Sequence, residues 1–108
     1  MTTAERRARN ESVFREANER LEELGEELGG DSVEFVCECG DLACSQALEV
    51  PISVYEAVRA DSRRFLVAPG HQRAELERVV EEHSRFLVVE KSGTAGEIAE
   101  ETDPRADA

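Results

Sequence analysis

The stretch Cys37-Glu-Cys39-Gly-Asp-Leu-Ala-Cys44 holds all three cysteines of the 108-residue chain. An odd number of cysteines packed this tightly does not fit a disulfide framework, whereas it fits a metal-binding knuckle. In such a knuckle a strand delivers the first thiolate, and a turn with Gly40 after the second cysteine lets backbone N–H groups point at sulfur. The stretch therefore predicts a metal site that ties together a small domain.

The fourth ligand is expected to be a histidine. Zinc binds four ligands in tetrahedral geometry, commonly four cysteines or three cysteines and one histidine. The chain has two histidines, one on a sharp Pro-Gly turn after an apolar strand and one in a polar run. We therefore predict Zn²⁺ bound by Cys37, Cys39, Cys44 and His71, with His83 as the alternative fourth ligand.

Other outcomes stay open, because the spacing C-x-C-x4-C differs from the common C-x2-C knuckle of zinc fingers. The plainest is three reduced cysteines, one or two of them packed as small hydrophobic side chains. A redox-active pair is less favoured, since no C-x-x-C motif is present. An iron–sulfur cluster is also less favoured, because such a cluster usually takes four cysteines and the chain has three.

A catalytic role for the metal is not expected. The sequence has no H-E-x-x-H, no G-x-S-x-G and no glycine-rich phosphate-binding loop. Three thiolate ligands would also leave zinc with little Lewis acidity. We therefore predict a structural site without catalytic residues, and a thiol redox enzyme or zinc enzyme is the least favoured interpretation.

The charge of the chain is acidic and uneven. The net charge is −12, of which residues 31–52 contribute −5 and residues 92–108 contribute −4, while residues 53–91 are neutral overall. Nucleic-acid binding is not expected, because affinity for phosphate backbones comes from Lys and Arg. The acidic segment supports an alternative function, an acidic regulator or nucleic-acid mimic that binds a basic protein surface.

Membrane insertion and secretion are not expected either. The chain has no apolar run near the ~20 residues that span a bilayer. Its first nine residues are polar and lack the apolar stretch of a secretory signal. We therefore expect a small cytoplasmic protein.

Residues 4–28 have the spacing of one long amphipathic helix, which Gly29 and Gly30 end. An apolar stripe follows it at intervals of three and four residues. In the favoured interpretation this stripe packs on the domain core, and in the alternative it forms a dimeric coiled coil. The candidate helix interface is Phe14, Ala17, Leu21, Leu24 and Leu28.

Shorter elements follow the helix. Apolar and β-branched residues predict strands over 33–37, 48–52, 65–69 and 86–91. Ser53 and Glu56 form a capping-box pattern that predicts a helix over 53–60. Residues 76–82 fit either a helix or, in the favoured interpretation, a strand that pairs with 86–91 across a turn at 83–85.

The predicted fold is therefore α+β, with three parts. Residues 1–30 form the long N-terminal helix. Residues 31–91 form a zinc-stabilised core, with a small antiparallel sheet, the zinc knuckle, one short capped helix and a C-terminal β-hairpin. Residues 92–108 form an acidic tail that is expected to be disordered, apart from a short helical turn near 95–101.

The chain also resembles a family of small uncharacterised proteins of actinobacteria and other high-GC bacteria. The resemblance rests on Phe35-Val-Cys-Glu-Cys-Gly-Asp41 with Cys44, on Tyr55-Glu-Ala-Val-Arg59, on Pro69-Gly-His71 and on Val88-Val-Glu-Lys91. It implies that the three cysteines and the Pro-Gly-His71 turn belong to one pattern, and it brings no catalytic residue. These features together predict a non-catalytic, zinc-stabilised module that interacts with another protein or with a second copy of itself.

Overall fold

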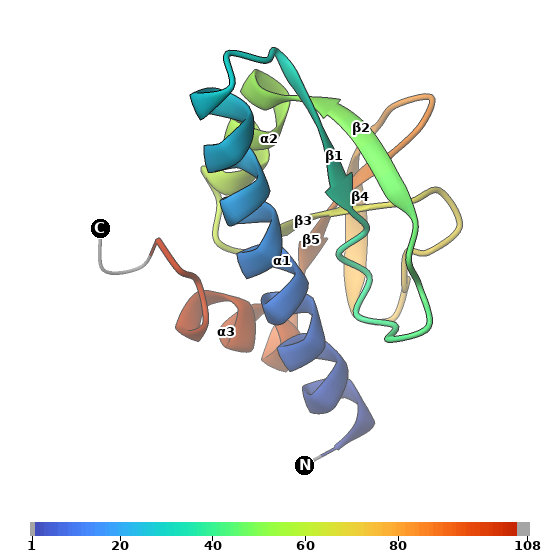
Figure 1. Cartoon of the computed structure of the whole chain (residues 1–108). Helices are drawn as coiled ribbons and strands as arrows, with labels where there is room; N and C mark the ends of the chain where they lie inside the picture. Colours follow the sequence, from blue (N-terminus) through green and yellow to red (C-terminus); the bar gives the residue numbers. More distant parts are fainter. Residues whose placement is uncertain (1, 106–108) are drawn as a thin grey trace.

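The long helix α1 (Thr3–Glu27) forms where the sequence predicts it. The Thr2 hydroxyl accepts a hydrogen bond from the Glu5 N–H, and the Glu5 carboxylate accepts one from the Thr2 N–H, so a capping box begins the helix. Gly29 follows its C-terminal end with a φ of 75°. In the computed structural model, which describes residues 2–105, α1 runs along one side of the molecule (Figure 1).

Within residues 2–105 five strands form two antiparallel sheets, which confirms the predicted α+β class. β1 (Ser32–Val36) pairs with β2 (Ala47–Pro51) in the first sheet. In the second sheet β5 (Leu87–Lys91) lies between β3 (Arg64–Val67) and β4 (Glu77–Glu82). The two-stranded sheet is too small to be stable by itself, so it depends on packing against the helices and in the shared core.

The hairpin of β4 and β5 confirms the favoured interpretation of residues 76–82. The two strands pair antiparallel, with an irregularity in the register between Val79 and Glu81. The turn between them is closed by the His83 N–H, which donates to the Phe86 carbonyl at 3.0 Å. The segment of ambiguous sequence pattern is therefore a strand.

The helix α2 (Ile52–Arg59) begins one residue earlier than predicted, with Pro51 at the N-cap position. The expected capping box of Ser53 and Glu56 is therefore wrong. The Glu56 carboxylate instead accepts hydrogen bonds from the Arg105 guanidinium at 2.9 and 3.0 Å, a partner 49 residues further along the chain.

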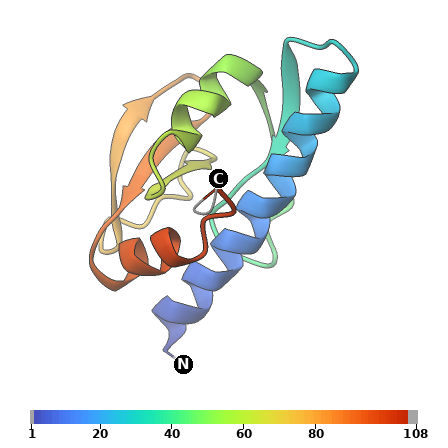
Figure 2. The same ribbon diagram turned by 90° about the vertical axis from the view of Figure 1, so that its left-hand side faces the viewer.

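The C-terminal segment is ordered as far as the structure describes it. Residues 93–101 form the helix α3 (Gly93–Glu101), which buries Ala95, Ile98 and Ala99. α3 packs against α1 and β5, and Figure 2 shows it beside α1. The helical turn expected near 95–101 is therefore confirmed, as part of a longer packed helix, whereas the disorder expected for the rest of the tail is wrong for the residues described up to 105. Residues 106–108 lie outside the described part. No helix within residues 2–105 combines the length and apolar character needed to cross a bilayer.

The core is one cluster of side chains from both sheets and α2. Phe35 on β1 stacks on Tyr55 of α2, with ring centroids 4.2 Å apart. Leu66 and Val88 fill the second sheet and are fully buried. Cys37 belongs to the same cluster, so the cysteine knuckle borders the core directly.

The buried face of α1 is polar, which corrects the expectation that its apolar stripe packs on the core. Leu21 does pack against the core and Phe14 is half-buried, but Ala17, Leu24 and Leu28 are exposed. The helix instead buries a row of mostly polar side chains, which are Ala8, Glu11, Ser12, Arg15, Asn18 and Glu22.

Each of two buried cations has specific partners. Arg15 of α1 donates to the carbonyl oxygens of Ser62 and Ala99, each at 2.7 Å, and lies over the Phe65 ring. Lys91 of β5 donates to the Glu11 and Glu77 carboxylates. Because Arg15 and Glu11 meet their partners only when α1 docks, the polar face is the one that the fold buries.

We expect Glu11→Gln to stabilise the protein above neutral pH. Burial raises the pKa of Glu11 from 4.5 to about 7, although the Lys91 ammonium opposes the shift. The folded protein then binds this proton more tightly than the unfolded chain, so the free energy of unfolding falls as the pH rises from about 4.5 to 7. The loss is up to about 3 kcal/mol, and the neutral variant avoids it.

Urea unfolding at pH 5 and pH 8, at one fixed metal content, measures this difference. The free energies of unfolding of the variant and the wild type should be most similar at pH 5, and at pH 8 the variant should be the more stable. Glu16→Gln on the exposed face of α1 is the matched control. Parallel stability curves for Glu11→Gln and the wild type would contradict the prediction.

Candidate metal centre

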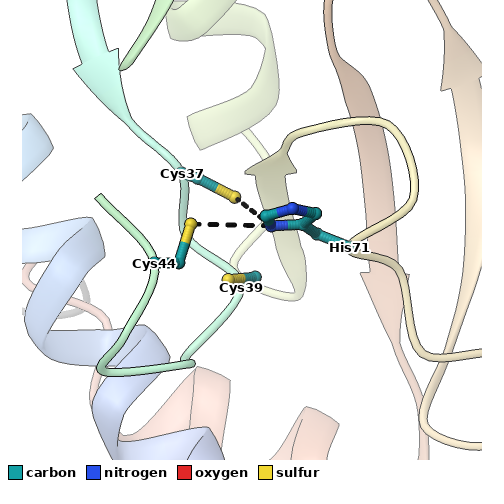
Figure 3. A group of neighbouring side chains, drawn as sticks. All are labelled: Cys37, Cys39, Cys44 and His71. Atoms are coloured by element: carbon teal, nitrogen blue, oxygen red, sulfur yellow. Dashed lines mark hydrogen bonds between the residues drawn. The ribbon is translucent and has the colours of Figure 1, made fainter. Parts of the chain in front are cut away.

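The structure brings the four predicted ligands together. Their ligand atoms all lie within 4.8 Å of one another. The Cys37 and Cys44 sulfurs lie 3.6 and 3.5 Å from Nδ1 of His71 (Figure 3). Zinc bonds of ~2.3 Å to sulfur and ~2.0 Å to nitrogen in a tetrahedron place S and N about 3.6 Å apart. The two measured distances therefore fit tetrahedral zinc coordination.

The ligands come from segments that follow strands of different sheets. Cys37 and Cys39 come directly after β1, and Cys44 lies in the loop that leads to β2. His71 lies in the loop between β3 and β4, where its N–H donates to the Ala68 carbonyl at 3.0 Å. A metal ion bound here would therefore join the first sheet to the second.

The turn after Cys39 requires glycine. Gly40 has a φ of 80°, and a Cβ atom at this position would lie 2.8 Å from the Arg7 carbonyl oxygen of α1. The Gly40 carbonyl also accepts a hydrogen bond from Nδ2 of Asn10 at 3.3 Å. The knuckle is therefore packed closely under the N-terminal half of α1.

Backbone amides point at two of the sulfurs, one amide from the knuckle turn and one from the segment after β3. The Ala68 N–H lies 3.2 Å from the Cys37 sulfur. Burial raises the pKa of the Cys37 and Cys39 thiols, and backbone amides of Ala68 and Asp41 act in the opposite direction. Without a cation the two buried thiols are neutral and weakly nucleophilic at pH 7, whereas a bound cation would favour their thiolates.

One side of the cluster borders a surface depression of about 330 Å³. Cys39 and His71 line this depression together with two basic residues, Arg7 and Arg73, and one acidic residue, Asp41. Three thiolates and one Zn²⁺ ion carry a net charge of about −1. The two guanidinium groups therefore have the sign of charge that complements a metal-bound cluster.

Sequence reasoning missed Glu38, which lies between the first two cysteines and is fully buried. Its Oε2 accepts hydrogen bonds from Nδ2 of Asn18 at 2.8 Å and from the Tyr55 hydroxyl at 2.7 Å. Its Oε1 accepts one from the Leu66 N–H at 2.8 Å. Burial raises the pKa of Glu38, and the three donors lower it.

No local signal marks Glu38 as buried, because it is one of five acidic residues in the segment 31–52. Its burial removes one negative charge from the surface of that segment. The acidic surface is therefore smaller than the sequence indicates. This weakens the alternative function, in which the protein is an acidic regulator or nucleic-acid mimic that binds a basic surface.

The second histidine lies elsewhere. His83 is in the turn between β4 and β5, where its ring stacks on Phe86 with centroids 4.2 Å apart. Its Nε2 lies 3.0 Å from a Glu81 carboxylate oxygen. Of the two histidines, the structure places His71 with the cysteines.

Three carboxylates of α1 and α2 also lie close together, and these are Glu22, Glu26 and Glu56. Arg105 donates to Glu22 at 3.0 Å and to Glu56 at 2.9 and 3.0 Å. Burial, assisted by the Glu56 carboxylate, raises the pKa of Glu22 to about 8. The guanidinium already supplies positive charge to this group, so we do not assign a metal to it.

Comparison of the chain with protein-family models, with curated proteins and with solved structures found no match.

Glu38→Gln should destabilise the protein by about 2–3 kcal/mol. An amide keeps the shape of the side chain, but its NH₂ group must face either the Leu66 N–H or the donors of Asn18 and Tyr55. At least one buried donor then loses its acceptor. Urea unfolding at fixed metal content measures the loss, and the exposed Glu34→Gln on β1 is the control. Equal stability of the two variants would contradict the prediction that the three hydrogen bonds to Glu38 stabilise the fold.

Gly40→Ala should cost clearly more stability than Gly70→Ala. Both glycines have positive φ, 80° and 90°, so either substitution introduces backbone strain of about 1–2 kcal/mol. Only at Gly40 would the added methyl group also meet α1, because nothing lies within 4 Å of a Cβ atom at Gly70. Thermal denaturation of the two variants compares the costs, and equal losses would argue against close packing of the knuckle under α1.

Proposed function

We propose that this protein is a small, non-catalytic module whose fold is held together by a structural zinc ion. The observation that carries the proposal is the meeting of three cysteine sulfurs and one histidine nitrogen within 4.8 Å of one another. Soft thiolate ligands with one imidazole in a tetrahedral arrangement favour zinc over magnesium or calcium. Four protein ligands complete its coordination, whereas catalytic zinc sites keep one position open for water or substrate.

A structural ion at this position would stabilise the contact between the two small sheets. The ligands at 37, 39, 44 and 71 connect a two-stranded sheet with a three-stranded sheet, and neither is large. Structural zinc supplies on the order of 10 kcal/mol of apparent binding free energy to small domains at pH 7. The link also closes the loop that contains α2. Thiolate ligands that remain reduced suit a reducing compartment such as the cytoplasm.

The second part of the proposal is that the outer side of α1 binds a protein. Val13, Leu24 and Leu28 are 63%, 54% and 85% exposed, and Ala17 is exposed beside them. We call these four residues the α1 face. Apolar side chains that gather along one exposed helix side are typical of interaction surfaces. The face differs from the predicted stripe because Leu21 packs against the core and Phe14 is half-buried.

Native mass spectrometry of the purified protein, with and without chelator, tests the metal centre. We expect one zinc ion per chain, and a large drop in melting temperature when it is removed. Cys44→Ser and His71→Ala should lose the ion, and His83→Ala should keep it. Cys44 and His71 are both half-buried, so these substitutions disturb the core less than a change at Cys37 would.

Two results would contradict the proposal. The first is a melting temperature that chelator leaves unchanged. The second is rapid alkylation of all three thiols by iodoacetamide in the protein as isolated, because zinc-bound thiolates are protected until the metal is removed. Rapid alkylation would favour the thiol redox interpretation.

A further inference from the structure

The exposed charges of α1 are separated along its length. Arg6 and Arg9 are exposed near its N-terminal end. Glu16, Glu23, Glu26 and Glu27 are exposed along its C-terminal half together with one basic residue, Arg20, and Asp31 follows in the loop to β1. The exposed charge is therefore basic at the N-terminal end of the helix and mainly acidic toward the C-terminal end.

Charged and apolar residues share the same side of the helix. Arg9 and Glu27 are 18 residues apart, which is five turns of 3.6 residues, so they project in about the same direction. Val13 and Leu24 are 11 residues apart, close to three turns. Val13, Ala17 and Leu24 of the α1 face therefore lie between a basic group at one end and an acidic group at the other, and Leu28 directly follows the acidic group.

This arrangement is complementary to itself only in the antiparallel orientation. When two α1 helices pack antiparallel with Val13 opposite Leu24 of the second copy, Arg9 comes opposite the region of Glu27. A two-fold axis repeats the same contacts at the other end of the pair. In a parallel pair Arg9 would face Arg9 and Glu27 would face Glu27, so like charges would repel.

From the exposed apolar residues and the charges that flank them, we propose that the partner of the α1 face is a second copy of this chain, bound antiparallel. The proposal names the partner for the interaction role suggested above and rests on that role, but it is independent of the metal. Figure 2 shows that α1 extends past the other elements at its N-terminal end, so a second helix can approach it along its length.

The charges decide the orientation and the apolar residues supply most of the association. Exposed ion pairs contribute little affinity each, whereas they penalise the wrong arrangement. A contact made by one helix pair is smaller than a standard protein–protein interface. We therefore expect a reversible dimer with a dissociation constant in the micromolar range, about 1–100 µM.

Sedimentation equilibrium of the zinc-loaded protein tests whether the dimer exists. The 12.0 kDa chain should approach twice its mass as the concentration rises. Val13→Gln combined with Leu24→Gln should stay monomeric over the same range and keep its zinc. Val79→Gln is the matched control, because Val79 is 37% exposed on β4, outside both α1 and the cysteine knuckle. A wild type that stays monomeric to 1 mM, or a dimer that survives the double substitution, would overturn the proposal.

A charge exchange tests the orientation. Arg9→Glu alone and Glu27→Arg alone should each weaken the dimer about tenfold, because each places like charges opposite one another at both ends. The two substitutions together restore opposite charges in an antiparallel pair and should recover the wild-type association. In a parallel pair the exchange still places like charges together, so no recovery would overturn the antiparallel arrangement.

The two proposals fail separately. If the protein binds zinc and chelation unfolds it, but it remains monomeric, the dimer is wrong and the metal centre stands. If the protein dimerises through the α1 face without bound metal, the metal centre is wrong and the dimer stands.

Discussion

The Glu38 carboxylate is the interaction on which the arrangement of this protein depends. It lies between two candidate metal ligands and receives hydrogen bonds from α1, from α2 and from β3. A buried carboxylate without partners would be strongly destabilising, and three well-placed donors offset that cost. Because the same residue belongs to the knuckle and to the core, the positions of Cys37 and Cys39 are coupled to the docking of both helices.

Asn18 extends this connection from the helix side. Its Nδ2 donates to the Val36 carbonyl and to Glu38, while its Oδ1 accepts from the Val36 N–H at 2.9 Å. α1 is therefore hydrogen-bonded to the last residue of β1, immediately before the knuckle. With Arg15 and Glu11 on the same face, α1 packs through specific polar contacts. This docking leaves most of the apolar side of α1 exposed, which is why an interaction surface is available there.

The candidate metal centre occupies the junction that these contacts create. The Cys37 N–H continues the pairing of the first sheet by donating to the Gln46 carbonyl at 3.0 Å. The Glu38 N–H donates to the Leu66 carbonyl at 2.8 Å and so reaches the second sheet. Backbone hydrogen bonds of two consecutive residues, Cys37 and Glu38, therefore reach both sheets beside the cluster. A metal ion at this point would reinforce a junction that the backbone already makes.

What the sequence by itself determined was local. The long helix, the strands and the cysteine knuckle were predictable, because helical periodicity, strand alternation and ligand spacing are properties of neighbouring residues. A histidine ligand was predictable by a count of ligands, since three cysteines leave one tetrahedral position, and the Pro-Gly turn favoured His71 over His83. The tertiary structure decided which face of α1 is buried, how the strands divide into two sheets, and that residues 93–101 form a packed helix. These features depend on partners far apart in the chain, such as Lys91 with Glu11 at a separation of 80 residues and Arg105 with Glu19 at a separation of 86. Such pairs leave no periodic pattern in the sequence, because the two partners are not neighbours along the chain. Folding brings them together, and a buried charge is stable only beside such a partner.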